Sequence, residues 1–148
     1  MKKRLAVLLA LFLTLASVSA AFAETASEPV RVDLDLSRMS STIVYAELYN
    51  IQYDPGQYLG KMIRISGQYS VYRDPVTQTV YYACVVPDAT ACCMQGMEFV
   101  PAGDPPDPDA PYDPEMIITV TGRLEIYVED GFSYLHLVDA DVQRQPES

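Results

Sequence analysis

The sequence predicts a mainly β domain in which five strands close into a small barrel and one N-terminal helix packs against it. Apolar and polar residues alternate with a period of two over most of the second half of the chain, which is typical of half-buried strands. The chain has 11 tyrosines, 11 prolines and no tryptophan, a composition that favours a β-rich domain over a helical bundle. Its 148 residues correspond to one domain.

The first 23 residues predict a cleavable export signal that is not part of the domain. Three basic residues, Lys2 to Arg4, precede an uncharged apolar run over 5–15, and Ala21-Phe22-Ala23 fits the small-x-small cleavage pattern. The apolar run is short for a membrane span and has no second charged flank, which favours cleavage over a retained anchor. We therefore expect an extracytoplasmic protein, secreted or periplasmic, with no stable membrane insertion once the signal is removed.

Without the signal the chain is more acidic than its total charge of −10 indicates. Three of the ten basic residues lie in the signal, so the remaining 125 residues carry 7 basic and 20 acidic groups, a charge of −13. Nucleic acids and anionic membrane surfaces both bind proteins through Lys and Arg. The charge therefore predicts no nucleic-acid partner and leaves a protein partner or a metal ion.

A helix is expected after a polar, flexible lead-in over 24–38. Ser40 and Ser41 are suitable N-cap residues, and Asp54-Pro55-Gly56 ends the helix. Three apolar residues recur at the spacing of one helix face: Val44, Leu48 and Ile51. We expect this face to pack on the sheet.

Five alternating runs predict the strands, and they cover 61–71, 77–86, 97–100, 116–128 and 132–138. Asp74-Pro75 begins one turn, and Glu129-Asp130-Gly131 forms a tight hairpin turn. Gly67 and Gly122 interrupt the two longest runs, where a glycine indicates a bulge or a sharp bend. In the fourth run, five apolar residues share one face: Ile118, Val120, Leu124, Ile126 and Val128.

Five strands, two of them long and bent at a glycine, are typical of an OB-type barrel. We place this domain at 39–142, followed by a polar tail over 143–148. Residues 101–114 contain six prolines and four aspartates, which predicts a surface loop with polyproline character. This loop stands where a helix often links the third and fourth strands of an OB fold.

Three segments resemble a family of small exported bacterial proteins with an OB-like barrel: YLGKMIRISGQY, ACVVPDATACCMQGMEF and ITVTGRLEIYVEDGFSYLHLVDA. The resemblance covers roughly 40–140. The GK-x-I-R-I-S-G opening is common to many OB-like barrels, whereas the ACC-x-QG-x-EF element is distinctive. The family has no established activity, so the resemblance implies fold and location rather than a reaction.

Three cysteines form the first candidate site. Cys84 lies near the end of a strand, and Cys92 and Cys93 follow across a short connection, so a hairpin would bring the three sulfurs together. Three thiolates with one further donor suit a zinc or copper(I) ion. The candidate fourth ligands or supporting groups are Glu98 first, then Asp88, Gln95 and the only histidine, His136.

Two alternatives remain for the cysteines. In an exported protein, Cys84 paired with Cys92 or Cys93 would form a stabilising disulfide in a protein-interaction domain. Alternatively, the three thiols would carry out thiol–disulfide exchange, which needs a thiolate of lowered pKa. The acidic neighbours Asp88 and Glu98 disfavour such a thiolate.

The tyrosines of the strands form a second candidate site. The outer face of the second and third strands is the usual ligand platform of OB-like barrels, and aromatic side chains stack on ligands there. Tyr82 lies in the second strand, and the other candidate binding residues are Gln95 and, in the fifth strand, His136. The sequence has no nucleophile motif and no phosphate-binding loop, so we assign no catalytic residue and predict an exported, non-enzymatic binding module.

We expect the exported protein to begin at Glu24. Small residues at Ala21 and Ala23 fit the signal-peptidase site. Intact mass measurement of the chain recovered after export would show the loss of residues 1–23. Recovery of the uncleaved chain in the membrane fraction would contradict this prediction.

Overall fold

The computed structural model describes residues 30–104 and 116–145. The export signal expected at 1–23, the centre of the proline-rich loop and the end of the polar tail lie outside the described residues. Within the described parts of the chain, no helix is both long enough and apolar enough to cross a membrane.

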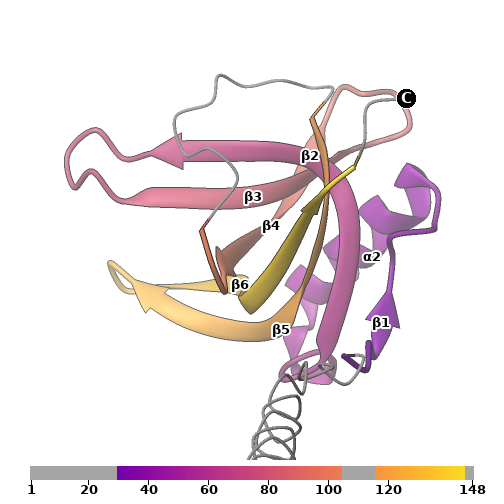
Figure 1. Cartoon of the computed structure of the whole chain (residues 1–148), viewed down its shortest axis with the longest axis horizontal. Coiled ribbons are helices and arrows are strands. Elements are labelled where there is room, and N and C mark those ends of the chain that lie inside the picture. The colour runs from indigo at the N-terminus through magenta and orange to yellow at the C-terminus, as the bar shows by residue number, and fades with distance from the viewer. Residues whose placement is uncertain (1–29, 105–115, 146–148) are drawn as a thin grey trace, which may run out of the picture. The chain divides into compact units, whose positions relative to one another are not determined.

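The described residues form six strands, one α-helix and one short 3₁₀ helix, so the expected mainly β fold with one helix is confirmed (Figure 1). The helices are α2 (Ser41–Tyr53) and η2 (Pro55–Gln57), and the strands are β1 (Leu34–Asp35), β2 (Met62–Arg73), β3 (Val80–Pro87), β4 (Met94–Pro101), β5 (Ile117–Glu129) and β6 (Phe132–Arg144). The strands follow the order β1-β2-β3-β4-β6-β5, and β2 also pairs with β5. This additional pairing closes a ring of hydrogen bonds through five strands.

β2 pairs with two strands of the ring, and it changes from one to the other beside Gly67. Its first half pairs with β5 and its second half pairs with β3, and Gln68 belongs to both pairings. A Cβ atom at Gly67 would lie 2.6 Å from the carbonyl oxygen of Val85 and 3.0 Å from Cys84 Sγ. A residue without a side chain is therefore needed for β3 to approach β2 at the bend.

Gly122 has a position in β5 similar to that of Gly67 in β2. It lies opposite Ile63 of β2, and the register between β5 and β6 shifts between Thr121 and Arg123. A Cβ atom at Gly122 would lie 2.9 Å from the Cβ atom of Leu137. Both mid-strand glycines thus mark the irregularities that the sequence predicts.

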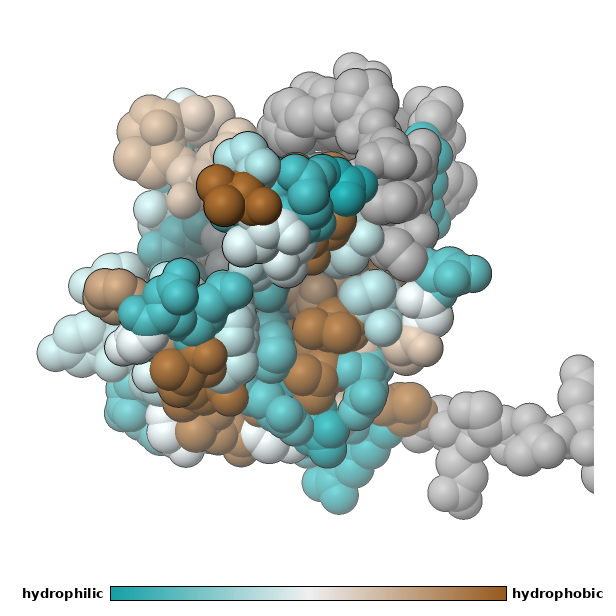
Figure 2. All heavy atoms as spheres, turned by 90° about the vertical axis from the view of Figure 1, so that its left-hand side faces the viewer, coloured by the Kyte–Doolittle hydropathy of each residue, from teal (hydrophilic) through white to brown (hydrophobic). Residues whose placement is uncertain are grey.

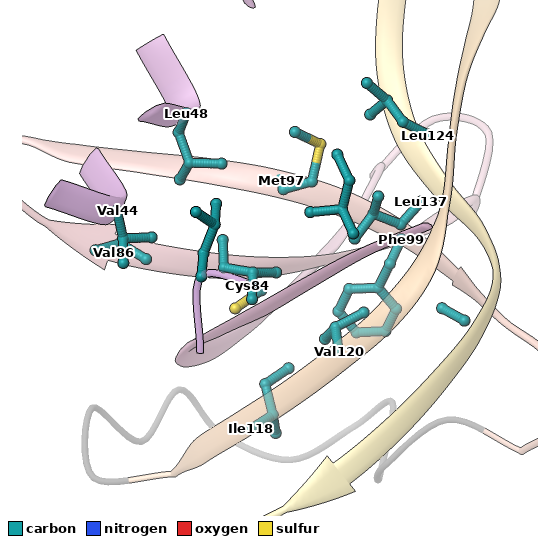
Figure 3. Packing of buried hydrophobic residues seen from close by; sticks show 14 of the residues in the cluster. Val44, Leu48, Cys84, Val86, Met97, Phe99, Ile118, Val120, Leu124 and Leu137 are labelled. Carbon is teal, nitrogen blue, oxygen red and sulfur yellow. The ribbon is translucent and has the colours of Figure 1, made fainter. Parts of the chain in front are cut away.

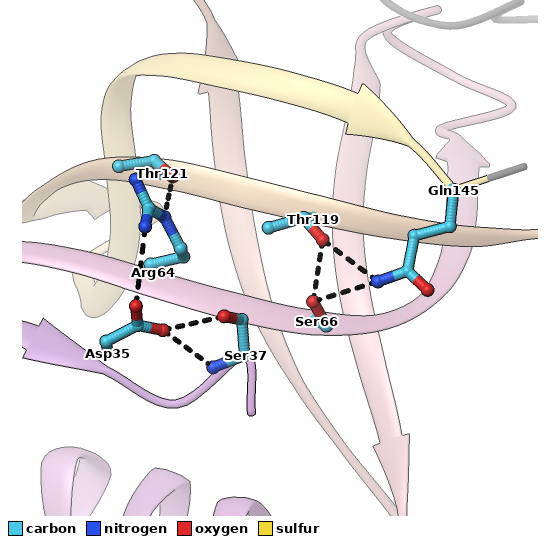
Figure 4. Close-up of polar contacts among 7 residues, drawn as sticks. All are labelled: Asp35, Ser37, Arg64, Ser66, Thr119, Thr121 and Gln145. Atoms are coloured by element: carbon cyan, nitrogen blue, oxygen red, sulfur yellow. Dashed lines mark hydrogen bonds and ion pairs between the residues drawn. The ribbon is translucent and has the colours of Figure 1, made fainter. Parts of the chain in front are cut away.

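Polar side chains join β2 and β5 on the face away from the core (Figure 4). The Oγ atoms of Ser66 and Thr119 lie 2.7 Å apart, and the Gln145 amide donates to Thr119 at 3.2 Å. Arg64 Nε donates to Thr121 Oγ1 at 3.0 Å. These bonds add to the backbone ladder at the pairing that closes the ring.

Residues 34–36 belong to the fold, which differs from the flexible lead-in expected over 24–38. β1 pairs in parallel with β2, and the Leu36 side chain is buried in the core. The Asp35 carboxylate pairs with Arg64 of β2 at 3.3 Å. This strand has only two residues and its partner lies far along the chain, so no local periodicity indicates it.

Helix α2 packs on β3 and β4 through the three apolar residues that predicted it. Val44, Leu48 and Ile51 are buried, and they belong to the same core cluster as Met97 of β4 (Figure 3). Ser40 occupies the N-cap position as expected, but its side chain makes no capping hydrogen bond. The helix therefore depends on its packing against the sheet rather than on its cap.

The far end of β5 differs from the expectation of a continuous buried face. Ile126 is 43 % exposed and Val128 is 69 % exposed. They lie beyond the ring, where β5 and β6 pair only with each other as a two-stranded hairpin. The tip is the expected tight turn, with φ angles of +50° at Asp130 and +83° at Gly131.

Gly67→Ala is expected to destabilise the fold by about 1–3 kcal/mol, because the new methyl group would overlap the backbone of β3. Gly103→Ala is the matched control, since nothing lies within 4 Å of a Cβ atom there. Its effect should stay within about 0.5 kcal/mol. Urea denaturation of the two variants measures the difference, and equal midpoints would contradict the role assigned to Gly67.

Candidate functional site

The β2–β3 and β5–β6 hairpins extend to the same side of the molecule (Figure 1). A cleft lies between them. The hollow between them has a volume of about 390 Å³. Figure 2 faces the hairpin tips and shows hydrophilic and apolar residues next to each other on this side. We call this hollow the acidic cleft, and its walls include Tyr72, Asp74, Tyr81, Tyr82, Glu98, Tyr127, Glu129, Asp130 and Tyr134.

Tyrosine rings stack in pairs on the two sides of the acidic cleft. Tyr72 and Tyr81 are cross-strand partners on β2 and β3, with ring centroids 6.3 Å apart. Tyr127 and Tyr134 are cross-strand partners on β5 and β6, with centroids 5.4 Å apart. Tyr82, a candidate binding residue from the sequence, lines the cleft and also packs against the core. Stacking holds these rings in fixed orientations.

Glu98 lies between the acidic cleft and an adjoining hollow of about 510 Å³. It accepts a hydrogen bond of 2.7 Å from the Tyr127 hydroxyl. His136 is the register partner of Glu98 across β4 and β6, and its ring lies 4.6 Å from the Tyr127 ring. Burial raises the pKa of Glu98, and burial together with the Glu98 hydrogen bond raises the pKa of Tyr127. Tyr127 therefore stays a protonated donor.

A second hydrogen bond joins the two hairpins directly. The Tyr81 hydroxyl on β3 donates to Glu129 Oε1 on β5 at 2.6 Å. This bond to a carboxylate raises the pKa of Tyr81 to about 12. In the β2–β3 turn, the Asp74 carboxylate accepts bonds of 2.7 Å from the backbone amides of Val76 and Thr77. The spacing of the hairpin tips is thus fixed by side chains of the cleft itself.

The cleft carries an uncompensated negative charge. Four carboxylates line it, from Asp74, Glu98, Glu129 and Asp130, and the described lining residues include no lysine or arginine. Tyrosine faces attract cations through their ring electrons, and carboxylates form charge-assisted hydrogen bonds with ammonium and guanidinium groups. The arrangement is therefore suited to a cationic group.

The structure does not bring together the four residues expected to hold a metal. Cys84 is fully buried in the core, where burial raises its pKa to about 12 (Figure 3). Glu98 lies in the acidic cleft, whereas Cys92 and Cys93 are exposed in the turn between β3 and β4. Successive side chains of a strand point to opposite faces, so Cys84 and its partner Met97 face the core while Glu98 faces outward.

A smaller cluster forms within the β3–β4 turn. One donor atom each of Asp88, Cys92 and Cys93 lies within 4.8 Å of the others. Gln95 and His136, considered as supporting groups from the sequence, are not members of this cluster. Gln95 lies in β4, with its Oε1 atom buried and without a hydrogen-bond partner among the described residues. Asp88 is thus the third donor near the two exposed thiols.

The electrostatics of the turn disfavour thiol–disulfide catalysis. The hydrogen bond with Cys92, followed by burial and the charge of Asp88, raises the pKa of Cys93. A catalytic thiol needs a lowered pKa, because the thiolate is the nucleophile. The three cysteines, all within the described residues, are free thiols, and the disulfide alternative stays a prediction.

Sequence reasoning found the tyrosines of the cleft and named Glu98, although as a metal ligand, but it missed the other three carboxylates. Glu129 and Asp130 were interpreted as a solvated turn, and Asp74 as the start of another turn. The one feature of the sequence that could have indicated them is that the connections of both hairpins contain acidic residues. These carboxylates line one cleft because the two hairpins extend to the same side, an arrangement that only the closed ring shows.

No protein-family model, no curated protein and no solved structure matches this chain. The resemblance to exported OB-like proteins over 40–140 therefore stays a prediction. The chemistry of the cleft and of the β3–β4 turn is the basis for assigning a function.

Glu98→Gln is expected to stabilise the fold at neutral pH. Because burial raises the pKa of Glu98 above its ordinary value of 4.5, stability falls as the pH rises from 4.5 through the raised pKa, and it stays lower above it. Glutamine keeps an acceptor for Tyr127 without the charge. The midpoint temperature of thermal unfolding should be higher for the variant than for the unsubstituted protein at about pH 7. This difference should be absent well below pH 4.5. A variant that is less stable at about pH 7 would contradict the prediction.

Proposed function

We propose that this chain is a non-enzymatic binding module, an OB-like barrel whose acidic cleft binds a cationic segment of a protein partner. One observation carries the proposal. Four carboxylates and paired tyrosine faces line a single cleft, and the described lining residues supply no positive charge to neutralise them.

The strand order supports the OB-like assignment. Counted from β2, the ring has the order first, second, third, fifth and fourth strand, closed by the first with the fourth. Ligands of OB folds bind over the second and third strands, between the loops that join strands one to two and four to five. The acidic cleft has the same position, since it lies over β3 and β4 between the β2–β3 and β5–β6 turns.

The shape of the site favours a segment of chain over a small ion. The acidic cleft and the adjoining hollow share Glu98 and Tyr134 in their walls, so a bound segment of chain could reach from one into the other. The adjoining hollow includes the apolar side chains of Ile126 and Leu135. A peptide that carries both basic and apolar side chains would meet carboxylates with its basic groups in the first part and apolar surface with its apolar groups in the second.

The charge of the whole chain supports the same class of ligand. At −10, the chain attracts cations over a longer range than any one contact, and it repels nucleic acid, the other common ligand of tyrosine platforms on OB folds. The export predicted from the first 23 residues would place this module outside the cytoplasm. There its partner would be an extracytoplasmic protein with a basic segment.

We expect a labelled ten-residue peptide that alternates arginine and leucine to bind the full-length protein with saturation. Glu98→Gln and Glu129→Gln should each weaken binding by about tenfold, which corresponds to about 1.4 kcal/mol for one charged contact. Fluorescence anisotropy measures the affinity, and added salt should reduce it because the contacts are ionic.

Asp141→Asn is the matched control, since it removes one exposed charge that lies outside the acidic cleft. Its affinity should stay within about twofold of the unsubstituted protein, because exposed charges are screened by solvent. A peptide of alternating glutamate and leucine and a single-stranded oligonucleotide should not bind. Equal weakening by all three substitutions, or binding of the acidic peptide, would reject the proposal.

A further inference from the structure

The β3–β4 turn gathers three metal-binding donors at distances close to those around a tetrahedral ion. The Sγ atoms of Cys92 and Cys93 lie 3.5 Å apart, and Cys92 Sγ lies 3.3 Å from Asp88 Oδ2. With Zn–S bonds of about 2.3 Å and Zn–O bonds of about 2.0 Å, tetrahedral geometry separates two sulfurs by about 3.8 Å and a sulfur from an oxygen by about 3.5 Å. These two separations are within a few tenths of an ångström of those values, and the third pair, Asp88 and Cys93, lies within 4.8 Å, so the Cys93 side chain would move toward Asp88 as an ion is bound.

We propose that Asp88, Cys92 and Cys93 bind one Zn²⁺ ion at a site separate from the acidic cleft. The three donors occupy one face of the tetrahedron. Both cysteines are exposed, so the fourth position is open to water or to a donor from another molecule. Sites with three protein ligands and one open position are a common form of zinc coordination.

The carboxylate is already oriented for this role. Asp88 Oδ1 accepts hydrogen bonds of 3.0 Å from the backbone amides of Thr90 and Cys92, which leaves Oδ2 facing the Cys92 thiol. The Thr90 hydroxyl lies 3.1 Å from Cys92 Sγ and 3.2 Å from Asp88 Oδ2, so it can donate its proton to either group. Such outer contacts fix the orientation of ligands before the metal arrives.

The charges of the turn also favour a cation. The Asp88 carboxylate lies beside two adjacent thiols, and the three groups repel one another once the thiols ionise. A divalent ion removes the repulsion and displaces the thiol protons. A mixed sulfur and oxygen donor set suits Zn²⁺, whereas copper(I) prefers sulfur donors alone.

The test is titration of the reduced full-length protein with Zn²⁺ by calorimetry, without oxygen. We expect one ion per chain. Cys92→Ser and Cys93→Ser should each weaken binding by more than about tenfold, since even the loss of an outer contact costs that much. Asp88→Asn keeps an oxygen for the two backbone amides, and its loss of charge should also weaken binding.

Two control variants distinguish this site from a metal site that would use Cys84 or Glu98. Cys84→Ala removes a buried thiol, and Glu98→Gln removes a cleft carboxylate, so both should keep the affinity for Zn²⁺ if the protein is folded by circular dichroism. Cobalt(II) titration should give the charge-transfer absorption of two thiolate ligands, and each exposed-cysteine variant should reduce it. Unchanged binding in the double Cys92→Ser, Cys93→Ser variant, or no binding to the reduced protein, would overturn the proposal.

Discussion

The close approach of β2 and β3 at Gly67 is the constraint on which the rest of the structure depends. The carbonyl oxygen of Val85 occupies the space that a side chain at this position would need. Because β2 can bend there, it pairs with β5 on one side of the bend and with β3 on the other, and the ring of five strands closes. Closure in turn directs the two hairpins past the ring on the same side (Figure 1), and the acidic cleft lies between them.

Alternation along the strands then decides which groups take part in chemistry. Cys84 and Met97 face each other inside the ring, where the thiol has no access to solvent. Glu98, one residue further along β4, lies on the other face with Tyr127 and His136. A step of one residue moves a side chain from the core to the outer surface, so neighbours in sequence have unrelated roles here.

The same physics explains what the sequence could predict. Helix α2 and the places of the five long strands follow from local periodicity, although the expected runs over 97–100 and 132–138 cover only parts of β4 and β6. The irregular positions in the two longest runs follow from Gly67 and Gly122. β1 has two residues and pairs with a strand almost 30 positions later, so no local pattern indicates it. The cleft carboxylates come from connections and strands far apart in the chain, and only ring closure brings them together. The spacing of Cys84, Cys92 and Cys93 predicts one cluster. Spacing along the chain does not show to which face of a strand a side chain points, and Cys84 points into the core.

The two candidate sites lie at opposite ends of β3 and should act independently. Tyr81 in the acidic cleft and Asp88 in the thiol turn are roughly 23 Å apart at about 3.3 Å per residue. This distance is well beyond the screening length of about 8 Å at physiological salt, so charge at one site has little effect on the other. Coupling would therefore require movement of β3. Its two neighbours, β2 and β4, hold it in register along both edges, and the bend at Gly67 leaves no space for it to shift toward β2.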